Sequence, residues 1–178
     1  MTRPLLLVSL ALLLACGASP EDRLEAARAA LAKGAYGDAA AAAREGLAAG
    51  AQGAVAWRLE LAALEGEARG KDGAAARARI ERLAGEKPDQ VRGPLYVQTA
   101  GQLREAGDAP GAIELLDAGV KRFPGDGDIA KAIESAKASG DDAERARLCS
   151  LGYLACDDAK PSGGGAAPAR PPAEPPKP

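Results

Sequence analysis

The feature that most constrains the fold is an internal repetition of glycines, which recur at Gly34, Gly70 and Gly107. The spacings are 36 and 37 residues, from 70 − 34 and 107 − 70. Small or apolar residues recur at fixed offsets from each glycine: Ala27, Ala63 and Ala100 before it, Ala39, Ala75 and Ala112 soon after it, and Leu47, Leu83 and Val120 further on. A repeat of this length indicates a series of similar units that stack on one another.

Each unit is predicted to be a helix, a tight turn and an antiparallel helix. Glycine in the turn can adopt backbone conformations that other residues avoid. Hydrophobic residues make up 47% of the chain, but many of them are alanines, and aromatic residues are only 3%. Alanine favours helices and buries little area, so close helix packing is expected in place of a core of large side chains. The predicted fold class is therefore all-α, a short α-solenoid of antiparallel helix pairs.

This pattern resembles the tetratricopeptide repeat, a helix pair with a period of about 34 residues. The unit around Gly107 fits best, with Tyr96 at the large early position, Ala100 at the small position and Pro124 after the second helix. The resemblance covers roughly residues 20–154, and we place the repeat domain at residues 20–156. The alternative is a plain helical bundle without repeat geometry.

Two units depart from the repeat pattern. In the second unit, Arg79 and Arg82 replace an apolar and a small residue. A degenerate fourth unit is expected from Asp126 past Gly140, where Arg145 replaces the expected alanine. An arginine there suits a solvated helix pair at the end of the stack.

Residues 1–15 resemble a bacterial lipoprotein signal peptide. Arg3 precedes an apolar run of about ten residues, too short to span a bilayer, which needs about 20. The run ends in Leu-Leu-Ala-Cys at residues 13–16, similar to the bacterial lipobox. The resemblance implies cleavage before Cys16 and a lipid on its thiol. Residues 16–19 would then form the anchor and a short linker, because Ser19 and Pro20 signal the start of a helix. The alternative is an ordinary secretory signal with a chance cysteine.

The lipoprotein resemblance also implies a location in the bacterial cell envelope. An aspartate after the lipidated cysteine would favour retention in the inner membrane, and Gly17 stands there instead. We therefore expect the protein at the outer membrane, facing the periplasm.

Residues 157–178 are predicted to be a disordered tail rich in proline and glycine. They contain three successive glycines at residues 163–165 and two Pro-Pro pairs. Such a segment cannot pack a core. We interpret it as a solubilising tail, and the alternatives are a ligand for a proline-recognising module or a strand threaded into the cell wall.

Cys149 and Cys156 are predicted to form a disulfide, since both would lie outside the cytoplasm, where disulfides persist. In one straight helix their Cα atoms would be about 10.5 Å apart, too far to bridge. Gly152 could end the helix and turn the chain back. The alternative is that Cys149 is a small apolar packing residue.

The sequence offers little catalytic chemistry. It contains no histidine, the commonest acid–base residue and metal ligand. Two cysteines cannot complete a four-ligand zinc site, and no phosphate-binding Gly-Lys-Ser/Thr motif occurs. A formal net charge of −2 gives no reason to expect nucleic acid. We expect no enzyme activity, no cofactor, no metal and no small-molecule substrate.

In tetratricopeptide arrays, the first helix of each pair lines a concave face that contacts ligands. The resemblance assigns this partner-binding role to Arg28 and Leu31 in the first unit, to Trp57, Glu60, Leu64 and Glu67 in the second, and to Val97, Arg104 and Glu105 in the third. Trp57 is the only tryptophan, and interface hot spots are enriched in that residue. The alternative is that a shift of one residue in register places Trp57 in the core.

Together these resemblances imply an adaptor or assembly factor at the membrane, whose groove binds an envelope protein that the sequence does not identify. One alternative is a structural tether between membrane and cell wall, with the helices as a spacer. Another is a regulator of a cell-wall enzyme. Deletion of residues 160–178 should abolish a tether and spare an adaptor.

Overall fold

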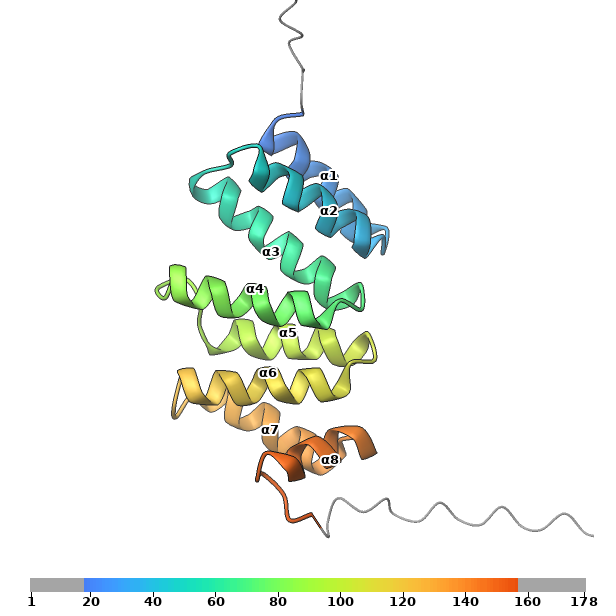
Figure 1. Ribbon diagram of the computed structural model, residues 1–178, viewed down its shortest axis with the longest axis vertical. Helices are drawn as coiled ribbons and strands as arrows, with labels where there is room; N and C mark the ends of the chain where they lie inside the picture. The colour runs from blue at the N-terminus through green and yellow to red at the C-terminus, as the bar shows by residue number, and fades with distance from the viewer. Residues whose placement is uncertain (1–17, 157–178) are drawn as a thin grey trace, which may run out of the picture.

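The computed structural model describes residues 18–156, and every regular element in that range is an α-helix (Figure 1). The helices are α1 (Pro20–Ala32), α2 (Tyr36–Ala48), α3 (Gly53–Arg69), α4 (Gly73–Glu86), α5 (Gly93–Glu105), α6 (Ala109–Arg122), α7 (Gly127–Ser139) and α8 (Asp142–Ser150). The prediction of an all-α fold is confirmed for this range. None of these helices has both the length and the apolar character needed to cross a bilayer. The predicted signal peptide, Cys16 and the predicted tail lie outside the described residues.

Short polar side chains fix the first residues of several helices. At α1, the Ser19 hydroxyl accepts a hydrogen bond from the Asp22 backbone N–H at 3.1 Å, and the Asp22 carboxylate accepts one from the Ser19 N–H at 3.0 Å. This reciprocal capping box satisfies two donors that a helix start leaves free. The hydrogen bonds from Ser19 hold the pKa of Asp22 below its usual value. Asp72 and Asp108 cap α4 and α6, each accepting from the N–H three residues on.

The predicted turn glycines separate the first and second helix of each pair. Gly34 and Gly107 have φ values of 73° and 92°, in the left-handed region that favours glycine. The turn at Gly70 differs, because the left-handed conformation falls on the next residue, Lys71, with φ of 66°. Sequence spacing located all three turns, although it did not distinguish their geometries.

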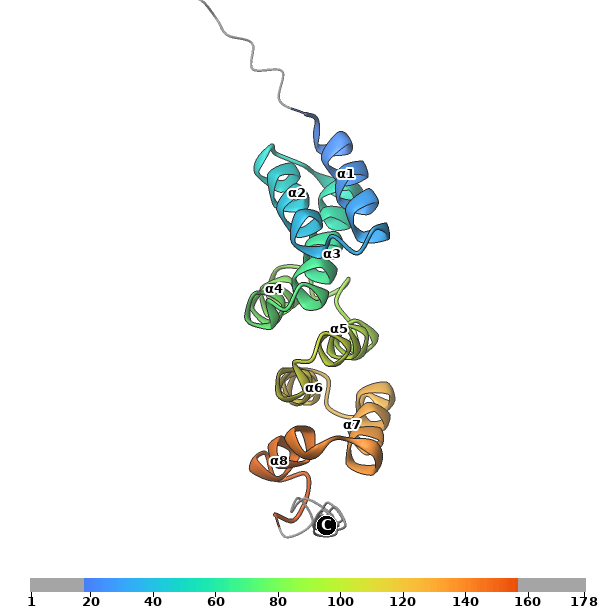
Figure 2. The ribbon, with the colours of Figure 1, turned by 90° about the vertical axis from the view of Figure 1, so that its right-hand side faces the viewer.

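The helices follow one another along the long axis of the molecule, from α1 at one end to α8 at the other (Figures 1 and 2). Every helix contacts its neighbours in sequence. The first helices of successive pairs also touch, α1 with α3, α3 with α5 and α5 with α7. Among the second helices, α4 contacts α6 and α6 contacts α8, whereas within residues 18–156 α2 contacts only α1 and α3.

The buried side chains form two clusters that divide within α3. The smaller cluster joins α1, α2 and α3 and consists of Leu24, Ala27, Ala43, Leu59, Ala62 and Ala63. The larger cluster begins at Leu64 and extends to Leu148. At its centre Tyr96 is fully buried and packs edge-on against Phe123, with ring centroids 5.8 Å apart. The alanine-rich smaller cluster therefore depends on close helix approach.

Glycines within the helices make that close approach possible. A Cβ atom on Gly66 of α3 would lie 2.8 Å from the Tyr36 carbonyl oxygen and 2.9 Å from the Ala40 backbone nitrogen, both in α2. A Cβ atom on Gly46 of α2 would lie 2.9 Å from a methyl group of Leu59. The α2–α3 interface is thus formed by backbone and alanine surfaces that leave no room for larger side chains.

Candidate partner-binding groove

The first helices α1, α3 and α5 line an open groove with a volume of about 310 Å³. Its lining combines leucines with arginine, glutamine and threonine side chains: Arg28, Leu31, Arg58, Leu61, Ala62, Leu64, Glu65, Leu95, Gln98, Thr99 and Gln102. No second helix contributes to this lining. The groove is therefore a property of the face that the first helices share.

Helical periodicity brings these residues to one face. In α3 the lining positions are 58, 61, 62, 64 and 65, in which 61 and 62 follow 58 by three and four residues and 64 and 65 follow 61 by the same intervals. Positions 95, 98, 99 and 102 of α5 match 58, 61, 62 and 65. Residues at this spacing lie on one side of a helix. The two sets also correspond through the repeat, because Arg58 precedes Gly70 by twelve residues and Leu95 precedes Gly107 by the same number.

Some polar side chains of the groove have hydrogen-bond or ion-pair partners within the protein, and others have none among the described residues. The Thr99 hydroxyl donates to the Leu95 carbonyl oxygen at 2.8 Å. Glu65 pairs with Arg69, with an Oε1–Nε distance of 3.2 Å. Arg28 and Arg58 are exposed, and their side chains form no ion pair or hydrogen bond with any residue in the range 18–156. The groove therefore presents two guanidinium groups that have no protein partner within residues 18–156.

Of the residues that the sequence assigns to partner binding, three line this groove: Arg28, Leu31 and Leu64. The other three assigned residues of α3 are Trp57, Glu60 and Glu67, and they face elsewhere. Arg58 and Leu61 of the groove are each one residue beyond an assigned position. One residue is about 100° of rotation around a helix, so Trp57 and Glu60 point to a different side of α3 from Arg58 and Leu61.

Trp57 packs toward the hydrophobic core, as expected from the alternative in which the register is shifted by one residue. Its side chain is half-buried and packs against the larger hydrophobic cluster. The Lys87 ammonium group sits over the indole, 5.5 Å from the ring centroid. Trp57 is therefore a packing residue at the α3–α4 side of the molecule, outside the groove.

Glu60 and Glu67 are buried in a network of ion pairs between α2, α3 and α4. The Arg79 guanidinium donates two hydrogen bonds of 2.8 Å to the Glu67 carboxylate and another to Glu60. Arg82 donates to both Glu60 oxygens at 2.9 and 2.8 Å, and Arg44 reaches Glu67 at 3.2 Å. The hydrogen bonds to Glu67, ahead of the smaller contribution of Glu60, raise the pKa of Arg79. The two arginines that break the repeat pattern thus neutralise carboxylates assigned to the groove.

The assigned residues of α5 are also displaced from the groove. Val97 and Arg104 line a separate cavity of about 150 Å³ between α5, α6, α7 and α8. In this cavity Arg104 lies 3.7 Å from the buried carboxylate of Glu144. Glu105 is exposed and pairs with Arg69 at 3.8 Å. The structure therefore divides the assigned set between the groove, an ion-pair network and a second cavity.

Sequence reasoning missed eight lining residues: Arg58, Leu61, Ala62, Glu65, Leu95, Gln98, Thr99 and Gln102. Lining positions in α3 and α5 match at equal offsets from Gly70 and Gly107, but the assigned residues Glu60 and Val97 match equally well. The turn glycines therefore align the helices without indicating which helix face lines the groove.

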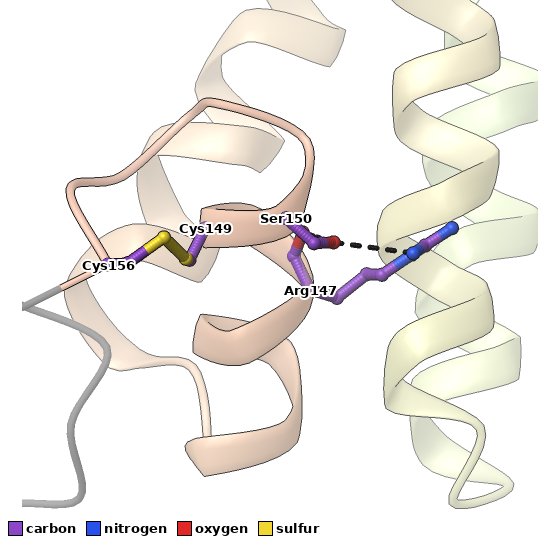
Figure 3. The surroundings of a disulfide bond; sticks show 4 residues. All are labelled: Arg147, Cys149, Ser150 and Cys156. Carbon is purple, nitrogen blue, oxygen red and sulfur yellow. Dashed lines mark hydrogen bonds between the residues drawn. A yellow bond between two sulfur atoms is a disulfide. The ribbon is translucent and has the colours of Figure 1, made fainter.

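Cys149 and Cys156 are joined by a disulfide with Cα atoms 5.0 Å apart (Figure 3). Gly152, with φ of 81°, turns the chain back, and its N–H donates to the Cys149 carbonyl oxygen at 2.9 Å. The Tyr153 hydroxyl then donates to Asp117 of α6 at 3.0 Å. The loop closed by the disulfide therefore attaches the end of α8 to α6. Within the described residues, no group of three or more thiols and carboxylates could hold a metal ion.

The chain matches no protein family, no curated protein and no solved structure.

Proposed function

We propose that the protein is an adaptor of the bacterial cell envelope that binds another protein through the groove of α1, α3 and α5. In this proposal the helix pairs form a short solenoid of tetratricopeptide type. The glycine repeat and the successive contacts of the first helices, α1 with α3 and α3 with α5, support that interpretation.

The observation that carries the proposal is the uncovered groove itself. It places apolar side chains beside charged groups that have no partner among the described residues. Leu31, Leu61 and Leu95 are only partly buried there. An exposed apolar patch rimmed by polar side chains is typical of a surface that binds another protein or a ligand.

The proposed location rests on the N-terminal sequence. A lipid on Cys16 would hold the domain close to the membrane, since Pro20 already begins α1. Two or more acyl chains suffice for stable anchoring. The adaptor would thereby keep its partner at the surface of the outer membrane.

Site-specific photocrosslinking in the native cells tests the proposal. A photoreactive amino acid replaces Leu61 in the groove, and a matched variant carries it at Ala78, which is exposed on α4. We expect a discrete crosslinked protein at position 61 and none at position 78. The same experiment with Cys16→Ser should leave an unprocessed precursor.

Two results would contradict the proposal. Identical adducts at positions 61 and 78 would mean that contact at the groove is nonspecific. The complete absence of an adduct at Leu61, in cells where the mature protein is present, would mean that the groove has no protein partner.

A further inference from the structure

The groove contains arginines that have no partner in the described part of the chain. Within residues 18–156, the arginines whose side chains have no ion pair or hydrogen bond are Arg28, Arg58 and Arg92. Two of these three line the groove. They come from different helices, Arg28 from α1 and Arg58 from α3, so the fold brings both charges into a single cleft.

Helix α5 contributes neutral amides to the groove. The side-chain amide of Gln102 has no hydrogen-bond partner among the described residues, and its atoms remain accessible. Gln98 lies one turn earlier on the same face and is also unpartnered. A carboxamide both donates and accepts, which matches the N–H and C=O of an extended peptide.

The groove also has an apolar floor. Leu61, Leu64 and Leu95 contribute side chains from α3 and α5. The acidic member of the lining, Glu65, pairs with Arg69. The groove thus combines basic, apolar and amide groups from three helices.

We propose that the groove binds an extended peptide segment in which an acidic side chain neighbours an apolar one. The carboxylate contacts Arg28 and Arg58, the apolar side chain packs on the leucine floor, and the peptide backbone bonds to Gln98 and Gln102. Guanidinium groups suit this role because they bind carboxylates through paired hydrogen bonds. The inference rests on the proposed function and adds the chemistry of the partner.

Selection from a library of random peptides displayed on phage tests this inference, with the detergent-solubilised full chain as bait. Three baits are compared: the native chain, the groove variant Arg28→Glu/Arg58→Glu, and the control variant Lys33→Glu/Lys71→Glu. Lys33 and Lys71 are exposed turn residues without ion pairs, so the control makes the same change in net charge. Circular dichroism melting curves establish that all three baits are folded.

We expect the native chain and the control to select peptides with Asp or Glu next to a large apolar residue. The groove variant should lose those peptides and favour Lys or Arg instead. For one selected peptide, each reversed arginine should weaken binding by about tenfold or more, the usual effect of losing a hydrogen bond to a charged group. Gln102→Ala should weaken the same peptide without changing its charge preference.

The outcomes separate this inference from the proposed function. Selection of apolar peptides without acidic enrichment would overturn the inference and leave the adaptor role standing. No selected peptides on any bait would contradict both. If the groove variant instead lost binding to phosphatidylglycerol vesicles while its peptides stayed unchanged, the arginines would serve the membrane and the inference would be wrong.

Discussion

Arg79 shows how a side chain that departs from the repeat pattern can still be accommodated in the interior. Its side chain is 11% exposed, and its partners Glu60 and Glu67 are 10% and 3% exposed. The fork of the guanidinium satisfies both carboxylates at once. Because each charge is costly to bury alone, the three residues depend on one another.

This dependence predicts the effect of Arg79→Met. The substitution leaves Glu67 buried without its main partner and removes one of the two partners of Glu60, so the free energy of unfolding should fall by about 3 kcal/mol or more. Chemical denaturation measures the loss. Replacing the three buried members of the network, Arg79→Met with Glu60→Met and Glu67→Leu, should recover most of it. A triple variant no more stable than the single one would contradict this account.

Tyr96 supplies a prediction about alkaline stability. Burial, assisted by the hydrogen bond that its hydroxyl donates to Glu81 at 2.8 Å, raises the pKa of Tyr96. Because the pKa of Tyr96 is higher in the folded state, the protonated hydroxyl contributes fully to stability below the pKa of tyrosine in the unfolded chain, about 10. Above that pH its contribution declines. The unfolding free energy should therefore fall above pH ~10, and Tyr96→Phe should remove part of that dependence. Ultraviolet difference spectra at stepwise pH provide the check.

Trp57 gives the sharpest contrast between packing and binding. Because its ring packs against the larger cluster, Trp57→Ala should cost about 3 kcal/mol of stability, the lower end of the range for a buried aromatic. Binding of a groove peptide below the melting temperature should be unchanged. Loss of that binding in a variant that melts normally would return Trp57 to the binding site.

At the scale of the helices, the α2–α3 contact depends on glycine where side chains would collide. A Cβ on Gly66 would meet the α2 backbone at 2.8 Å, whereas a Cβ on Gly101 of α5 would meet nothing within 4 Å. Gly66→Ala should therefore destabilise the fold by about 1–3 kcal/mol through overpacking. Gly101→Ala should stabilise it by up to about 1 kcal/mol through helix propensity. Melting temperatures that shift in the same direction for both variants would refute the comparison.

Helix ends were predictable from local chemistry, whereas helix rotation was not. Gly34 and Gly107 mark turns because their backbone conformation favours glycine, and the Ser19–Asp22 motif marks a helix start because both capping groups belong to the same short segment. The rotation of α3 depends on contacts with α2 and α4 together. Arg79 reaches across from α4 to Glu60 and Glu67, and neither partner can be inferred from the pattern of α3 alone. Half-buried leucines such as Leu61 also look alike in sequence whether they face a core or a groove.

At the scale of the whole molecule, each helix in residues 18–156 contacts only its own pair and the adjacent pairs, so a local change should have local effects. Replacing both disulfide cysteines, Cys149→Ser with Cys156→Ser, should cost less than the ~3 kcal/mol associated with a 15-residue loop. Hydrogen exchange should show faster exchange in α8 and unchanged protection in α1 to α5. Loss of protection that spread to α3 would contradict the local character of the stack.

The division of the interior within α3 has a consequence for how occupancy of the groove and unfolding are linked. Ala62 belongs to the smaller hydrophobic cluster and Leu64 to the larger one, and both line the groove. A ligand that contacts both clusters would lose binding energy when either cluster opens. In the proposed adaptor, a bound partner would therefore make the two clusters unfold together.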